Sequence, residues 1–283
     1  RESQLLPVST PKKLGIMEAI FFREAHPIVF ALRDDGIYCI DILSDSSEET
    51  VLTFLRTLDA NKVDTVYIDP VDSIRSAAAI AFPSANLVVT DECILRYARD
   101  AMLEIIHEDG KRFPVKFKDA VLTIPSKRLQ SDFQRRQVAD GMKIRPRLSK
   151  AYEQHQALME LMSGEWTYEA VSKKAHELSS NLPEFETLVD VIDLFEQEIN
   201  DYIETEEKPP EFYPTALQAI CEAFKGMPHC IFDVLRARCF LTIGHDTIEE
   251  NGTKYRLGIH TTRLTQNMNE ISKNIKEARE YGL

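Results

Sequence analysis

The sequence lacks the apolar runs and the leader segment that a membrane or secreted protein needs. Its 283 residues contain no apolar run of ~18 residues, which is about the length of a membrane-spanning helix. No positively charged, apolar and small-residue leader opens the chain either. The chain begins with Arg1 and not with Met, so we expect a fragment or processed form that lacks an upstream domain. No contact with a membrane is predicted.

Close cysteine pairs and zinc-type histidine spacing are also missing. The five cysteines never form a C-x-x-C pair and lie mostly within apolar patterns; they are Cys39, Cys93, Cys221, Cys230 and Cys239. None of the seven histidines shows the i, i+4 spacing on a predicted helix that zinc enzymes use. Buried thiols in a reducing compartment fit this pattern. We therefore predict a cytoplasmic protein.

Positive charge is scarce, because the net charge is −12. This balance argues against bulk non-specific affinity for nucleic acid, which needs Lys and Arg to displace counterions from phosphates. Residues 184–211 nevertheless form an acidic stretch, and a basic stretch contains Lys111, Arg112, Lys116, Lys118, Lys127, Arg128, Arg135, Arg136, Lys143, Arg145, Arg147 and Lys150. The two stretches form a bipolar surface or are simply solvated helix faces.

The first part of the chain has the pattern of an antiparallel meander. Residues 14–22 (LGIMEAIFF), 26–34 (HPIVFALRD) and 36–44 (GIYCIDILS) read as strands. The Asp34-Asp35-Gly36 sequence between the last two is typical of a tight hairpin. Three consecutive antiparallel strands are predicted.

Two crossover units follow the meander. Ser46 and Ser47 precede an amphipathic pattern that predicts a helix over residues 48–60, and a strand follows at 65–69. Residues 72–82 and 86–90 repeat the helix and the strand. Because such connections join parallel strands, we predict an α/β fold whose mixed five-stranded sheet carries crossover helices. This order is that of the ribonuclease H-like fold, although other mixed α/β folds also have it.

The middle of the chain is predicted to be a large all-helical insertion. Helical periodicity runs from residue 91 to about residue 204, and the run TEEKPPEFYP then interrupts it. We predict the first part of the core at residues 1–110, the insertion at 111–207, and closing helices of the core with a C-terminal segment at 208–283. Within that last part, NGTKYRLGI at 251–259 indicates a turn and a short strand.

Two acids mark the C-terminal ends of the crossover strands. Asp69 follows VYI and Asp91 follows LVVT, and open α/β sheets place ligands beyond such strand ends. Both acids are therefore candidates for chemistry. Each also precedes or opens a predicted helix, so a capping or first-turn role is the alternative.

Three segments together resemble a known family. They are residues 14–21 (LGIMEAIF), 63–92 (VDTVYIDPVDSIRSAAAIAFPSANLVVTDE) and 232–238 (FDVLRAR), with the helical insertion in the expected place. They resemble the bacterial insertion-sequence transposases of the ISL-three type, which have a DDE catalytic domain on a ribonuclease H-like fold. The FPSAN step between the two acid-tipped strands is the most specific part.

The resemblance implies a two-metal phosphoryl transfer on DNA. Three carboxylates would hold two Mg²⁺ (or Mn²⁺) ions, which activate water or a 3′-hydroxyl at a phosphodiester. The partners implied are the DNA ends of a mobile element and a second copy of the chain in a homodimer. Arg236 and Arg238 are candidates to contact DNA or to pair with the acidic helices.

Carried over residue by residue, the resemblance leaves the set of carboxylates incomplete. Asp69 matches the second aspartate and is the predicted metal ligand, and Asp91 matches a further acid of the family. The first aspartate falls on Met17, beside Glu18, which a one-residue shift on a strand points to the opposite face. The glutamate falls on Ile220 in an ungapped reading, with Glu222 about half a turn further on. Asp69, Asp91, Glu222 and Glu18 are thus the candidate catalytic residues.

Three functions follow from this incomplete set. The first is a transposase-like protein impaired in DNA strand cleavage and transfer. The second is an active Mg²⁺-dependent transposase that uses rearranged acids. The third is a non-enzymatic regulator that binds DNA or protein.

Overall fold

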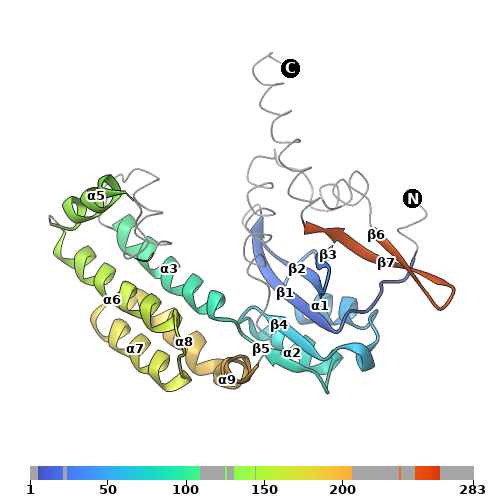
Figure 1. The fold of residues 1–283 in the computed structure, drawn as a ribbon. Coiled ribbons are helices and arrows are strands. Elements are labelled where there is room, and N and C mark those ends of the chain that lie inside the picture. Colours follow the sequence, from blue (N-terminus) through green and yellow to red (C-terminus); the bar gives the residue numbers. More distant parts are fainter. Residues whose placement is uncertain are drawn as a thin grey trace, which may run out of the picture. The chain divides into compact units, whose positions relative to one another are not determined.

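A computed structural model describes residues 6–21, 24–108, 125, 131–143, 145–205, 236 and 246–261 (Figure 1). The chain divides into two compact units, Arg1–Val88 with Glu207–Leu283 and Val89–Glu206. The boundaries after residues 110 and 207 remain predictions. Within the described ranges, no helix has the length and apolar character needed to cross a membrane.

The first unit, here called the sheet unit, is built on a mixed β-sheet (Figure 1). The strand order is β5-β4-β1-β2-β3-β7-β6. β1, β2 and β3 pair antiparallel, whereas β4 pairs parallel with β1 and with β5. The meander and the two crossover strands are therefore confirmed. The strands are β1 Lys13–Phe21, β2 Glu24–Arg33, β3 Gly36–Ile42, β4 Thr65–Ile68, β5 Asn86–Val88, β6 Asp246–Glu250 and β7 Thr253–His260.

The sheet has seven strands in the described part of the chain, so the prediction of five strands was too few. The two additional strands, β6 and β7, form a hairpin whose turn residues Asn251 and Gly252 have positive φ angles of 52° and 76°. The sequence indicated the turn and β7. It did not indicate β6, because Asp246–Glu250 (DTIEE) offers one large apolar side chain and no alternation. β7 extends the sheet by pairing with β3 at Tyr38 and Cys39.

Between β3 and β5, which are fully described, the chain forms two α-helices, α1 at Glu48–Leu55 and α2 at Asp72–Ala81. Ser47 is the N-cap of α1, as predicted, and its Oγ accepts a hydrogen bond from Thr50 N at 3.3 Å. The helices pack against each other, and α2 contacts β4 and β5. The core of this unit includes Ile16, Val29, Ile40, Val51, Val66 and Ile74, all fully buried.

The second unit, here called the helical unit, contains helices and no strand in its described residues (Figure 1). α3 packs against α6 and α8, and α7 packs against the same two helices. Buried residues recur at helical spacing, as in Leu148, Ala151, His155 and Leu158 of α6. The α-helices are α3 Asp91–Glu108, α5 Asp132–Lys143, α6 Pro146–Met162, α7 Tyr168–Asn181, α8 Glu186–Leu194 and α9 Glu196–Glu204.

Candidate functional site

Asp69 lies directly beyond the end of β4 and is fully buried, with 0% of its surface exposed. Its Oδ2 accepts a hydrogen bond of 2.6 Å from Glu18 N, and its own N donates to Ile16 O at 2.9 Å. Its carbonyl oxygen instead accepts from Val71 N at 2.7 Å, as the chain turns toward α2. If the parallel pairing continued, Glu18 N would donate to the main-chain carbonyl of Asp69. In this structure the side-chain carboxylate of Asp69 accepts that hydrogen bond instead.

The capping alternative for Asp69 is not what the structure has. The N-cap of α2 is Val71, which makes no side-chain capping bond. The acid in the first turn of that helix is Asp72, which pairs with Arg75. Asp69 therefore terminates a strand pair and does not begin a helix.

The register of β1 against β4 places Met17 beside Asp69. Gly15 pairs with Tyr67 and Ile16 with Ile68, so the next step in register aligns Met17 with Asp69. Aligned residues of paired strands point to the same face of a sheet. Met17 is buried, with 3% of its surface exposed. A thioether therefore stands next to Asp69 where the family pattern has an aspartate.

Glu18 contacts Asp69 through its backbone, and it lies one residue beyond Met17 on β1. Its N–H donates to Asp69, and its side chain is half-buried. Consecutive side chains of a strand point to opposite faces. The Glu18 carboxylate is therefore directed to the face opposite that of Met17.

Asp91 belongs to the helical unit and opens α3. Its Oδ1 accepts hydrogen bonds from Tyr202 Oη at 2.8 Å and from Glu92 N at 2.9 Å. Thr90, whose Oγ1 accepts from Cys93 N at 3.4 Å, occupies the capping position. Asp91 is thus a first-turn acid that favours the helix N-terminus and ties α3 to α9.

The surroundings of Asp91 shift the pKa of the neighbouring Glu92 upward. Burial raises the pKa of Glu92; Arg99 opposes that shift, and the Asp91 carboxylate adds to it. Two adjacent carboxylates at one helix start therefore differ in environment, with Asp91 hydrogen-bonded to Tyr202 and Glu92 half-buried.

The described donors do not fit a two-magnesium centre. Mg²⁺ requires several hard oxygen ligands in octahedral geometry, and Met17 supplies a soft sulfur beside Asp69. Across the described ranges, no group of three or more His, Cys, Asp or Glu side chains is arranged to hold a metal ion. Glu222, the remaining candidate, lies outside the described residues, as do Ile220 and Arg238.

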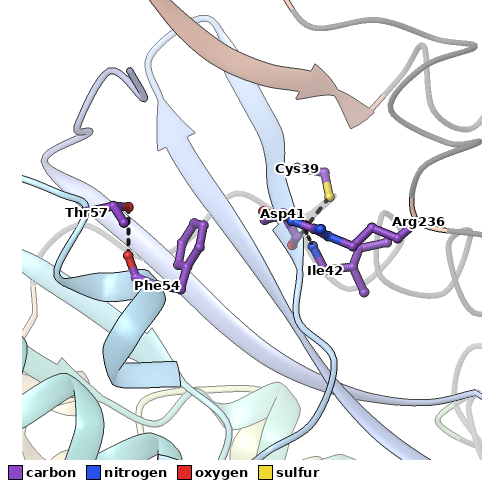
Figure 2. Close-up of polar contacts among 6 residues, drawn as sticks. All are labelled: Cys39, Asp41, Ile42, Phe54, Thr57 and Arg236. Atoms are coloured by element: carbon purple, nitrogen blue, oxygen red, sulfur yellow. Dashed lines mark hydrogen bonds and ion pairs between the residues drawn. The ribbon is translucent and has the colours of Figure 1, made fainter. Parts of the chain in front are cut away.

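An ion pair of the sheet unit, between buried Asp41 and part-exposed Arg236, was not predicted from the sequence. Asp41 of β3 is buried, and Arg236 donates to it through both Nε, at 2.6 Å to Oδ1, and Nη2, to Oδ2 (Figure 2). Ile42 N also donates to Oδ1, at 2.8 Å. Such two-pronged contacts are the strong geometry for an arginine and a carboxylate. An acid within an otherwise apolar strand, GIYCIDI, was the available signal.

Arg236 and the basic stretch find partners within their own units. Arg236 pairs with Asp41 of β3. In the helical unit, Arg147 pairs with Glu108 at 2.8 Å and with Glu184 at the start of the acidic stretch. Arg147 of the basic stretch thus forms ion pairs with acids of the same unit.

A comparison with known protein families identifies the family of this chain. The model of the DDE transposases of the ISL-three type, described as transposase, matches residues 14–208. No curated protein matches the chain. The matched range includes both Met17 and Asp69, and it covers more than half of the sequence. The chain therefore belongs to the ISL-three type of DDE transposases.

Proposed function

We propose that this chain is a transposase-derived protein that binds DNA of a mobile element and is impaired in strand cleavage and transfer. The observation that carries the proposal is the register that aligns Met17 with Asp69. In a two-metal site both ions need bridging and flanking carboxylates. A methionine at this point removes one hard ligand from the position nearest to Asp69.

The proposed scaffold is a ribonuclease H-like core with an inserted helical unit. Support comes from the order β5-β4-β1-β2-β3, in which a meander and two parallel crossover strands share β1 as the central strand. We further propose that residues 1–110 and 208–283 form the core and that 111–207 are the insertion. The hairpin of β6 and β7 is an addition at the β3 edge. A cytoplasmic location is proposed on the reduced, buried thiols of Cys39 and Cys93.

Metal binding provides the direct test of impairment. A calorimetric titration of the protein with Mn²⁺ is expected to give no heat of specific binding. Micromolar binding that is lost in Asp69→Asn would refute the proposal and favour the active enzyme with rearranged acids. Asparagine keeps an oxygen that accepts from Glu18 N, so the variant is expected to fold.

A matched control distinguishes Mn²⁺ binding at Asp69 from Mn²⁺ binding to surface carboxylates. Asp72→Asn makes the same chemical change three residues away, on an exposed side chain paired with Arg75. A heat of Mn²⁺ binding that is lost equally in both variants would indicate weak binding to surface carboxylates. This result would be consistent with the proposed loss of strand cleavage and transfer. Binding to duplex DNA, followed by fluorescence anisotropy, tests the remaining part of the proposal, because a protein without affinity for duplex DNA contradicts it.

A further inference from the structure

Arg256 of β7 has a half-buried guanidinium without a partner in the described part of the chain. Its Nε is buried and makes no hydrogen bond. Burial lowers the pKa of this arginine. Since desolvating a charge is costly unless the charge is paired and hydrogen-bonded, such a side chain is suited to bind an anion.

The backbone of Arg256 is fixed on both sides. Its N donates to Pro7 O at 2.8 Å, and its O accepts from Ser9 N at 2.8 Å. β6 pairs with it on the other edge, at Thr247. The side chain therefore starts from a strand that is held by two neighbours, which reduces the entropy lost when a ligand binds.

The nearest acid does not neutralise Arg256. Asp41 attracts it electrostatically, but this carboxylate already accepts two hydrogen bonds from Arg236 and one from Ile42 N (Figure 2). Arg236 lies close enough to lower the pKa of Arg256 further. Two guanidinium groups thus share the surroundings of one carboxylate, and the charge of Arg256 stays uncompensated at contact distance by described residues.

We propose that Arg256, with Arg236 beside it, forms a site for a phosphate group, and that the phosphate belongs to the backbone of a nucleic acid. The planar fork of an arginine matches the oxygens of a phosphate. Partial burial lowers the effective dielectric and strengthens the contact. The assignment to nucleic acid rests on the proposed function, whereas the phosphate site itself does not.

Inorganic phosphate tests the site without DNA. At constant ionic strength, replacing chloride by saturating phosphate is expected to raise the melting temperature of the wild type by ~3 °C or more. Arg256→Gln is expected to lose this shift. Lys254→Gln, an equal charge change at an exposed position of the same strand, is expected to keep it. A wild type that does not respond, or an Arg256→Gln protein that responds equally, overturns the site.

A duplex oligonucleotide tests the source of the phosphate. Arg256→Gln is expected to weaken binding ~5-fold to 10-fold and to reduce the slope of log affinity against log salt by ~1, with little effect from Lys254→Gln. Arg256→Lys keeps the charge but not the fork, so it should keep the slope while weakening binding, and it serves if the glutamine variant fails to fold. One outcome is a variant that loses the rise in melting temperature with phosphate and still binds the duplex as tightly as the wild type. This result overturns the assignment of the phosphate to a nucleic acid and indicates a site for free phosphate. A wild type that binds no duplex refutes the proposed function as well, while the phosphate experiment still decides the site.

Discussion

His155 offers the sharpest prediction about stability. This residue of α6 is buried, with 1% of its surface exposed, and neither ring nitrogen has a hydrogen-bond partner. Leaving a buried polar group without a partner costs about 1–3 kcal/mol. We therefore expect His155→Leu to raise the free energy of unfolding at pH 7.5 by about 1–2 kcal/mol, after allowance for imperfect repacking.

The pKa of His155 determines the direction in which the free energy of unfolding changes with pH. Burial and, to a smaller extent, the positive charge of Arg99 on α3 together lower the pKa of His155 from 6.5 to about 4. Because the folded value is depressed, the unfolded chain takes up the proton first. The part of the free energy of unfolding that depends on a neutral His155 is therefore fully present above pH 6.5, and it is lost as the pH falls toward 4. At ~1.36 kcal/mol per pH unit, the loss amounts to about 3 kcal/mol.

Urea unfolding at pH 7.5, 6.0 and 5.0 measures both effects. The fluorescence of Trp166, the sole tryptophan, reports on the helical unit that contains His155. His155→Leu should unfold at higher urea and lose less stability on acidification than the wild type. Acids such as Glu92 titrate in both proteins, so the difference between them isolates His155. The exposed His107 of α3 provides the matched control His107→Leu. A less stable His155→Leu at pH 7.5, or an unchanged pH profile, would refute the reasoning.

Three further predictions concern the sheet unit. Ser47→Ala removes the N-cap of α1 and should cost about 1 kcal/mol in urea unfolding, whereas an unchanged midpoint would mean that Asp45 and Thr50 hold the helix start without it. Gly258→Ala should destabilise the pairing of β7 with β3, because φ is 113° and the new Cβ would lie 2.6 Å from Cys39 O; hydrogen exchange at Ile259 N–H should accelerate, and equal protection would contradict this. Met17→Asp should lower the melting temperature in EDTA, since it places a second carboxylate beside buried Asp69, and Mn²⁺ should restore part of the loss; a variant as stable as the wild type in EDTA would argue against the aligned register.

The meander and the crossovers were predictable because local patterns encode them. Short, nearly continuous apolar runs and the Asp34-Asp35-Gly36 turn between them specified β2 and β3, and a serine marked the start of α1. β6 was not predictable, since its strand character comes from pairing with β7 and not from its own composition. Tertiary context decides such strands.

The candidate site was predictable only in part, for a similar reason. The acid at Asp69 and the methionine at position 17 could be read from the chain, but their alignment depends on the register of β1 against β4. Asp41 and Arg236 are 195 residues apart, and no local pattern joins them. Asp69, Asp91, Glu18 and Glu222 remain predictions as catalytic residues.

The β6–β7 hairpin changes which strand is exposed to other chains. By pairing with Tyr38 and Cys39, it converts apolar β3 from a border into an interior strand. Among the described strands, the outer strand on this side is β6, where Asp246, Glu249 and Glu250 carry like charges, and the outer strand on the other side, β5, is only 3 residues long. Charged or very short borders discourage sheets of separate molecules from joining edge to edge. The hairpin thus covers the edge of β3 and leaves a strand rich in acidic side chains in its place at the side of the sheet.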